Sequence, residues 1–207
     1  MNKCLLLYSG GLDSTVLLYE LVKEGKSVHC VLINYGSKHN EMEHKAALKH
    51  IVKFNLTYSL VALTYSCEKL GSALTDKDIA VPSDPTEQHL TVFPYRNTVM
   101  LSIASSIAVP MGVKEIYIAA NKDDYEVYKD CRSEFFTALN IGFEYGAPGQ
   151  DNHTRVIAPF LGMTKKDIVQ AAKAYGFPFE DTYSCYQGGE QPCGECGPCK
   201  LIKEAMK

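Results

Sequence analysis

The sequence has no long apolar run. Near its start, a short apolar stretch that begins at Cys4 is interrupted by Ser9, Gly10 and Gly11, and then by Asp13. This stretch is too short for the apolar region of a signal peptide, and no later segment approaches the ~20 apolar residues of a membrane span. We therefore expect a cytoplasmic protein that does not contact a membrane.

An excess of positive charge is also missing. The 21 lysines and arginines face 24 aspartates and glutamates, so the formal net charge is −3. No basic run extends beyond Lys165-Lys166. Proteins that hold a long nucleic-acid backbone need a broad positive field, so we expect no direct nucleic-acid partner.

Two common nucleotide-binding motifs are absent as well. The sequence contains no G-x-x-x-x-G-K-[ST] motif, and no G-x-G-x-x-G motif follows a predicted strand. The first absence excludes a Walker-type phosphate loop, and the second leaves a dinucleotide-binding Rossmann site without support.

The sequence does contain enough apolar material for a sizeable core. Its 207 residues are 46% hydrophobic and 22% charged, which excludes disorder as the main state and suits one domain with a small appendage. Short apolar segments alternate with helical ones, which is typical of an α/β fold with a doubly wound, mostly parallel sheet. We predict strands at residues 3–8, 28–34, 58–62, 115–120 and 156–159, and helices at 14–24, 39–54, 96–108, 133–143 and 164–175.

Two segments interrupt this alternation. Residues 64–94 are polar and turn-rich, and we predict a long functional loop there. Residues 121–132 carry several carboxylates and are expected at the carboxyl edge of the sheet, where doubly wound folds bind ligands. The last segment is rich in cysteine, so we divide the chain into an α/β domain, residues 1–180, and a small metal-binding tail, residues 181–207.

The first predicted strand runs directly into a glycine turn and a helix. Gly10 and Gly11 allow backbone N–H groups to approach an anion closely, and the helix N-terminus adds its positive dipole end. Asp13 beside an anion is unfavourable unless a cation bridges the two, which indicates Mg²⁺. The alternative is an ordinary turn in which Asp13 and Ser14 cap the helix.

Four of the eight cysteines lie close together near the end of the sequence. Cys185, Cys193, Cys196 and Cys199 have the spacing C-x7-C-x2-C-x2-C, interrupted by glycines. Four thiolates on tight turns suit a closed, structural Zn²⁺ site. An iron–sulfur cluster could use the same ligands, and Cys196-Gly197-Pro198-Cys199 also matches a thioredoxin-type redox motif.

The string S-G-G-L-D-S-T resembles the pyrophosphatase loop of the N-type ATP pyrophosphatases. This resemblance implies that ATP is cleaved to AMP and pyrophosphate during adenylation of an acceptor oxygen. It also implies that Lys165 contacts the phosphates. The implied nucleotide site is Leu7, Tyr8, Ser9, Gly10, Gly11, Leu12, Asp13, Ser14 and Thr15.

Further strings, in the same order along the chain, resemble the 7-cyano-7-deazaguanine synthase family. They are G-S-A-L-T-D (71–76), R-N-T (96–98), D-C-R-S-E-F (130–135), T-Y-S-C-Y-Q-G-G (182–189) and C-G-E-C-G-P-C (193–199). The resemblance implies an adenine nucleotide alpha hydrolase-like fold and a homodimer. It implies an ATP-dependent, AMP-forming ligase that converts 7-carboxy-7-deazaguanine and ammonia to the 7-cyano product in queuosine biosynthesis. The implied cofactors are ATP, Mg²⁺ and Zn²⁺.

The implied acceptor site combines the start of one helix with the acidic loop. Arg96, expected to be catalytic with Asp13 and Lys165, can pair with a substrate carboxylate or a phosphate. Asn97 lies beside it. Asp124, Asp130 and Arg132 are expected to bind the guanine-like acceptor. The alternative for Arg96 and Asn97 is an ordinary helix start, and the alternative for the acidic residues is a solvated loop. His39 matches a family histidine, but it can equally be a helix cap or a polar surface residue.

Residues 125–135 depart from the family pattern, with Glu126 and Lys129 added and a glycine and a proline lost. A related enzyme that stops at the amide or uses another acceptor therefore stays open. Three other hypotheses remain: a tRNA-modifying ATP pyrophosphatase, a non-enzymatic nucleotide sensor, and a thiol oxidoreductase that uses Cys196 and Cys199.

Overall fold

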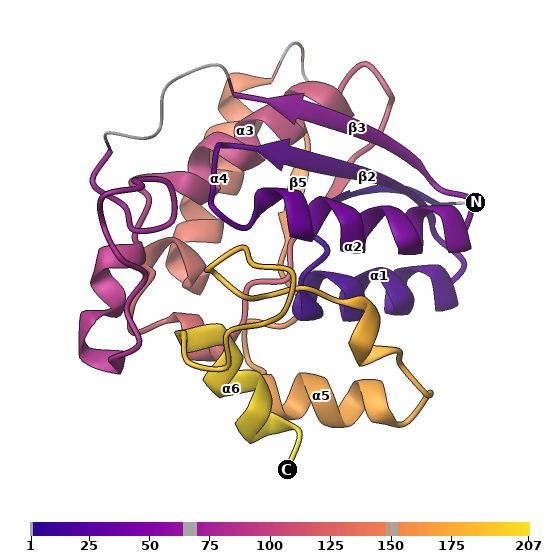
Figure 1. Ribbon diagram of the computed structural model, residues 1–207. Helices are drawn as coiled ribbons and strands as arrows, with labels where there is room; N and C mark the ends of the chain where they lie inside the picture. Colours follow the sequence, from indigo (N-terminus) through magenta and orange to yellow (C-terminus); the bar gives the residue numbers. More distant parts are fainter. Residues whose placement is uncertain (1, 64–69, 148, 150–152) are drawn as a thin grey trace.

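The computed structural model describes residues 2–63, 70–147, 149 and 153–207, and its centre is a five-stranded parallel sheet (Figure 1). The strand order is β3-β2-β1-β4-β5, and every pair of neighbours is parallel. The strands are β1 (Lys3–Leu7), β2 (Ser27–Asn34), β3 (Thr57–Ala62), β4 (Glu115–Tyr117) and β5 (Arg155–Ile157). The predicted doubly wound α/β fold is confirmed.

Helices cover both faces of the sheet, because successive side chains of a strand point to opposite faces. Leu6 packs on one side, in a cluster with residues of α1 (Leu12–Lys23), α2 (Asn40–Lys53) and α5 (Lys165–Lys173). Leu5 packs on the other side, against α3 (Arg96–Ala108) and α4 (Ser133–Gly146). The chain winds outward from β1 to β3 and then returns to β4, so the strand order reverses between β1 and β4. A crevice for ligands forms at such a reversal, beyond the carboxyl ends of the strands.

The strands after the reversal are shorter than the sequence pattern predicts. β4 ends at Tyr117 and β5 at Ile157, although the Ile118 N–H still donates to the Ile157 carbonyl, at 3.0 Å. The predicted strand over residues 115–120 therefore gives way early to the backbone that enters the crevice.

The predicted loop over residues 64–94 is largely ordered where it is described. Residues 64–69 lie outside the described part of the chain. Beyond them, Ser72 and Thr91 are buried, and the Ser72 hydroxyl donates to the Thr91 carbonyl, at 3.2 Å. The 3-10 helix η2 (Pro85–Thr91) is capped by Asp84, which accepts the Thr86 N–H at 2.8 Å.

Helix α5 begins as the sequence predicts, with Thr164 as its N-cap. The Thr164 hydroxyl accepts the Asp167 N–H at 3.2 Å, and the Asp167 carboxylate accepts the Thr164 N–H at 2.8 Å, which completes a capping box. This cap fixes Lys165 in the first turn of the helix, where it is buried beside the crevice.

The cysteine-rich segment packs against the α/β part of the chain. Its last helix, α6 (Gly197–Ala205), lies along α5 (Figure 1). Ala205 joins the core cluster on the α1 side of the sheet. The proposed boundary between residues 180 and 181 stays a prediction.

None of the helices in the described part of the chain has the length and apolar character needed to cross a membrane.

Candidate active site

The loop between β1 and α1 is shaped by two glycines. Gly10 has φ +89°, and a Cβ there would lie 2.3 Å from the Glu43 carbonyl oxygen on α2. Only glycine allows this turn and this contact together. Gly11 is the N-cap of α1, and its N–H donates to the Ser9 hydroxyl at 3.1 Å. Ser9 and Ser14 share a hydroxyl hydrogen bond at 3.1 Å. The loop and the helix N-terminus thus form an anion-binding cradle.

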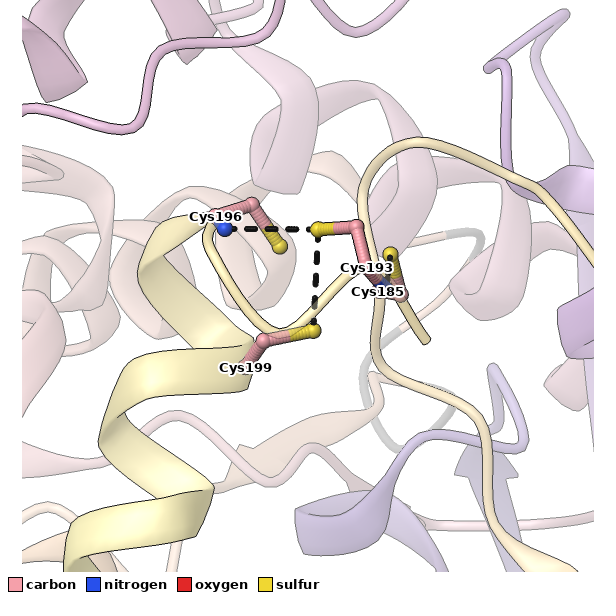
Figure 2. A group of neighbouring side chains, drawn as sticks. All are labelled: Cys185, Cys193, Cys196 and Cys199. Carbon is pink, nitrogen blue, oxygen red and sulfur yellow. Dashed lines mark hydrogen bonds between the residues drawn. The ribbon is translucent and has the colours of Figure 1, made fainter. Parts of the chain in front are cut away.

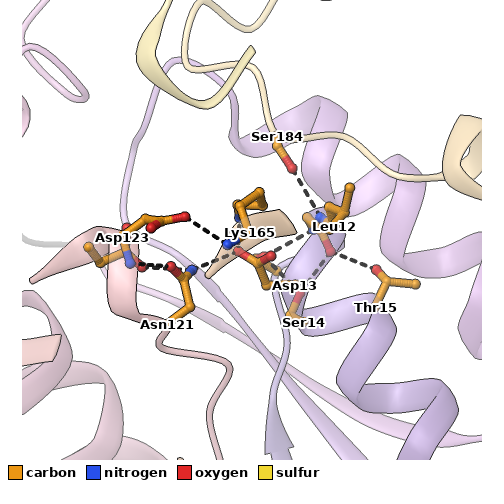
Figure 3. A network of polar contacts seen from close by, with 11 residues as sticks. Leu12, Asp13, Ser14, Thr15, Asn121, Asp123, Lys165 and Ser184 are labelled. Atoms are coloured by element: carbon orange, nitrogen blue, oxygen red, sulfur yellow. Dashed lines mark hydrogen bonds and ion pairs between the residues drawn. The ribbon is translucent and has the colours of Figure 1, made fainter. Parts of the chain in front are cut away.

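A polar network joins this loop to the segment that follows β4 and to the start of α5 (Figure 3). The Lys165 ammonium pairs with Oδ2 of Asp13. The Asn121 amide donates to carboxylate oxygens of Asp13 and Asp124, each at 3.1 Å. Asp123 accepts the backbone N–H of Lys165 at 2.7 Å. Residues from three separate segments therefore converge at the loop.

The network leaves one acceptor free for a cation. Oδ1 of Asp13 is buried and has no hydrogen-bond partner among the described residues. Burial raises the pKa of Asp124 to about 6, with Lys165 opposing and Asp13 reinforcing this shift. Two carboxylates with a single ammonium between them suit a hard divalent cation with oxygen ligands, so the residues present fit Mg²⁺.

The C-terminal segment lies directly over the loop. The Ser184 hydroxyl accepts the backbone N–H of Leu12 at 3.0 Å, as Figure 3 shows. The Tyr183 N–H donates to the Gly10 carbonyl at 3.1 Å. The turn that precedes the first clustered cysteine is thus part of the loop's own hydrogen-bond network.

One cavity extends from the phosphate loop, which lines its first end, to a second end near α3. Tyr35, His39, Glu43, Arg96 and Tyr186 line this end, together with Asn97, Met100 and Cys131. The Arg96 guanidinium lies over the Tyr128 ring, 5.4 Å from its centroid. A permanently charged guanidinium among tyrosine rings can receive an anionic acceptor group. We call this region, lined by these eight residues, the acceptor end.

Burial changes the charge state of two other groups at the acceptor end. It lowers the pKa of His39 to about 4, with a further contribution from Arg96 and an opposing one from the Tyr186 carbonyl. It raises the pKa of Glu43 to about 8, against the opposing effect of Arg96. His39 is therefore neutral at pH 7, and Glu43 titrates close to neutral pH.

The predicted site residues divide into two groups. Asp124, Arg96 and Asn97 line the cavity with the loop residues and Lys165, whereas Asp130 and Arg132 are not among its lining residues. Asp130 accepts the Asn97 N–H at 3.2 Å, and Arg132 donates to the Tyr125 carbonyl at 2.7 Å. Both side chains brace the loop that carries them, so their direct contact with an acceptor stays a prediction. Thr15 faces inward, where its hydroxyl donates to the Gly11 carbonyl at 2.8 Å.

The four clustered cysteines converge on one point, as Figure 2 shows. All four Sγ atoms lie within 4.8 Å of one another, and those of Cys193 and Cys199 are 4.0 Å apart. A tetrahedral ion with Zn–S bonds near 2.3 Å places its sulfurs about 3.8 Å apart. Burial opposes ionisation of Cys193, but N–H donors from Cys196 and Glu195 lower the pKa of its thiol. The donor set fits one thiophilic metal ion.

A family model described as queuosine biosynthesis protein QueC matches residues 3–207. The chain belongs to the QueC family. A 7-cyano-7-deazaguanine synthase of Archaeoglobus fulgidus is 37% identical over 206 residues, which cover 99% of this chain and 85% of the relative. The enzyme of the same name from Aquifex aeolicus is 38% identical over 211 residues, with coverages of 98% and 95%. The predicted family is confirmed.

Solved structures resemble this QueC family member in fold. A 4-thiouridine synthetase in complex with RNA and ATP superposes with a TM-score of 0.57 at 22% identity, covering 99% of this chain and 50% of that one. The U34-tRNA thiolase NcsA from Methanococcus maripaludis, with its [4Fe-4S] cluster, gives a TM-score of 0.56 at 16% identity, with coverages of 99% and 70%. These similarities support the predicted α/β fold.

Several residues of this QueC site escaped the sequence analysis. Asn121 could have been found from the sequence, because it directly follows the predicted strand over residues 115–120, at the carboxyl edge of the sheet. Ser184 stands in the family-like string at residues 182–189, but its contact with Leu12 could not be foreseen, since it joins residues far apart in the sequence. Glu43 resembles an ordinary acidic residue in a first helical turn, where the helix dipole favours negative charge.

Proposed function

We propose that the chain is an ATP-dependent ligase that converts 7-carboxy-7-deazaguanine and ammonia to 7-cyano-7-deazaguanine. The observation that carries this proposal is the single cavity that holds the pyrophosphatase loop at one end and Arg96 at the other. An acid bound at the acceptor end can reach a nucleotide bound at the loop. The family relationship supports the same reaction.

A carboxylate is a poor electrophile, so the proposed reaction begins with its activation. A carboxylate oxygen attacks the α-phosphorus of ATP, and pyrophosphate leaves. Ammonia then displaces AMP from the acyl carbon and forms the amide. In a second round, the amide oxygen is adenylated, and loss of AMP and of both nitrogen-bound protons gives the nitrile. One ATP site used twice is sufficient for both rounds.

Residues at the loop end would stabilise the charge that develops during both adenylations. N–H groups at the start of α1 and the Lys165 ammonium are aimed at this region, and preorganised donors of this kind are usually the largest contribution to such catalysis. Asp13 and Asp124 would hold Mg²⁺, which neutralises phosphate charge when bound. Releasing Lys165 from Asp13 would then free its ammonium for the pyrophosphate.

At the acceptor end, Arg96 would pair with the substrate carboxylate before activation. Asn97 would contact the guanine-like ring, whose N–H groups need acceptors, whereas Asp124 is assigned to the cation at the loop end. We propose that Asp130 and Arg132 act mainly by holding residues 125–132 around this ring, because both are already engaged there.

The clustered cysteines would bind a structural Zn²⁺. A closed set of four thiolates leaves no open position for activating water. The cytoplasm is the proposed compartment, because these thiolates must stay reduced to bind a metal. We also propose a homodimer, which light scattering of the purified protein would detect as twice the chain mass.

The function is tested by supplying purified protein with ATP, Mg²⁺, ammonium and 7-carboxy-7-deazaguanine. We expect AMP and pyrophosphate to form only when the acid is present, and mass spectrometry to detect the nitrile. Product that stops at the amide would support the shorter reaction left open by residues 125–135. Absence of acid-dependent AMP would reject this acceptor.

A further inference from the structure

The acceptor end holds a buried carboxyl group to which the reaction above assigns no role. Glu43 lies in the first turn of α2 and lines the cavity, with 15% of its side chain exposed. Within the described part of the chain, no lysine or arginine forms an ion pair with it. Burying an unpaired acid lowers stability. A purely structural role therefore does not explain why a carboxyl group occupies this position.

Glu43 connects the two ends of the cavity, because its side chain lines the acceptor end and its backbone touches the phosphate loop. Its backbone carbonyl lies against Gly10 of the pyrophosphatase loop, where a Cβ would come within 2.3 Å. Its side chain shares the cavity wall with Arg96, whose charge acts on the pKa of Glu43. An acyl group held by Arg96 would therefore lie on the same stretch of cavity wall as this carboxyl group.

One neighbouring group is already close to the carboxyl. Nε2 of His39 is 3.7 Å from Oε2 of Glu43, and the Tyr35 hydroxyl is 3.5 Å from the same nitrogen. Because burial keeps His39 neutral, it does not fix Glu43 in the charged form through an ion pair. Glu43 thus remains able to gain and lose a proton.

Both product-forming steps of the proposed reaction release a proton from nitrogen. When ammonia attacks the acyl adenylate, the new C–N bond leaves a positive nitrogen, the C–O bond to AMP breaks, and one N–H proton must depart to give the neutral amide. The amide carries two N–H protons. One leaves when the amide oxygen is adenylated, and when the adenylated amide forms the nitrile the last N–H proton leaves, the C–N bond becomes triple, and AMP departs with the C–O electron pair. Each step needs a base beside the nitrogen.

We propose that Glu43 is the base that accepts the nitrogen-bound proton in both steps. This inference rests on the proposed function. The other carboxylates on the described cavity wall, Asp13 and Asp124, both accept the Asn121 amide at the loop end. A pKa near 8 is favourable for Glu43, because a general base works best when its pKa lies close to the working pH.

The inference is tested with Glu43→Gln, which keeps the side-chain shape and removes the base. Glu41→Gln is the matched control, because Glu41 lies on the same helix, is 80% exposed and pairs with Lys45. The substrate is the amide, 7-amido-7-deazaguanine, with ATP and Mg²⁺. This half of the reaction needs no ammonia, so the titration of ammonium does not affect the result.

We expect Glu43→Gln to slow nitrile formation from the amide by about 100-fold or more, and Glu41→Gln to stay within about threefold of the wild type. Exchange of labelled pyrophosphate into ATP, driven by 7-carboxy-7-deazaguanine, should persist in Glu43→Gln, since adenylation needs no proton acceptor at nitrogen. Amide formation from the acid and ammonia should fall together with nitrile formation.

A pH profile gives a readout that a merely structural role would not change. The wild-type rate from the amide should rise through pH 8 as Glu43 ionises, and Glu43→Gln should lose this rise. The titratable groups with shifted pKa values on the same cavity wall titrate elsewhere. Burial moves the pKa of His39 down to about 4, lowers that of His44, raises that of Asp124 to about 6 and moves those of Tyr35 and Tyr186 upward, and Arg96 stays charged. If Glu43→Gln melts far below the wild type, this wild-type profile still tests the proposal.

Three results would overturn the inference. The first is nitrile formation by Glu43→Gln within about threefold of the wild type. The second is a Glu43→Gln variant that loses pyrophosphate exchange as well as nitrile formation. The third is a wild-type rate that does not change through pH 8. A wild-type protein that yields no nitrile from the acid would instead reject the proposed function itself.

Discussion

Gly10 is a residue of the phosphate loop whose backbone leaves almost no freedom for substitution. Gly10→Ala would place a Cβ at φ +89°, 2.3 Å from the Glu43 carbonyl and 2.7 Å from the Ala47 nitrogen. Gly25→Ala is the matched control, because Gly25 has φ +74° but no atom within 4 Å of the added Cβ. We expect the control to lower the free energy of unfolding by about 1 kcal/mol, and Gly10→Ala to lower it by about 3 kcal/mol, since a backbone clash adds to the strain.

Urea denaturation of the two alanine variants would measure this difference. Equal losses of stability would mean that α2 does not press on the loop as described. ATP binding should also fail in Gly10→Ala alone, because the loop cannot turn toward the phosphates.

Asp13 is the residue on which the proposed magnesium site depends. Asp13→Asn removes the charge but keeps the hydrogen-bonding shape, so we expect the fold to persist and acid-dependent AMP formation to fall by about 100-fold or more. Circular dichroism checks the first expectation and chromatographic assay of AMP the second. Normal turnover at ordinary Mg²⁺ concentrations would contradict the assigned role.

The sequence predicted the chemistry at this scale better than the geometry. Ser9 to Ser14 could be recognised because the phosphate loop is a local motif, and Lys165 because it matches a lysine of the resembling family. Asp130 and Arg132 could not be placed, because their direction depends on Asn97 and Tyr125, which sequence patterns do not bring together.

At the scale of elements, the C-terminal turn before the first clustered cysteine supports the phosphate loop. Ser184→Ala removes the acceptor of the Leu12 N–H. We expect it to lower the free energy of unfolding by about 1 kcal/mol and to weaken ATP binding severalfold, because the loop loses a contact that orders it. Ser106→Ala is the matched control, since Ser106 is exposed and bonds only within its own helix, to the Ser102 carbonyl at 3.0 Å.

Isothermal titration of ATP into both serine variants would test this coupling. Equal affinities in Ser184→Ala and Ser106→Ala would show that the turn does not affect the loop.

Secondary structure was predictable where local pattern decides it. The helix over residues 96–108 was placed with the bounds that the structure has, because apolar positions recur at helical spacing and Pro110 follows. The order within residues 70–94 was not visible, since it depends on distant contacts such as the 2.5 Å hydrogen bond between Thr91 and Tyr128. The ends of β4 and β5 likewise depend on their neighbours in the sheet.

At the scale of the whole molecule, the cysteine cluster and the phosphate loop are parts of one structure. Tyr183 and Ser184 contact the phosphate loop, and Cys185 comes next in the chain. Gly188, with φ +76°, passes so close to Lys38 that a Cβ would lie 1.9 Å from its carbonyl oxygen. Loss of the metal should therefore disturb the ATP site as well as the tail.

Cys196→Ser tests this dependence, with Cys4→Ala as the control for a buried cysteine outside the cluster. Both variants should melt below the wild type, but only Cys196→Ser should lose its metal and its ATP binding together, because three remaining thiolates cannot close the site. Elemental analysis should find one zinc per wild-type chain. Iron with acid-labile sulfide would mean that the cysteines bind an iron–sulfur cluster and not zinc. Unchanged metal content in Cys196→Ser would reject the four-cysteine site. A metal-free variant that still binds ATP would show that the tail folds around its metal independently of the loop that it covers.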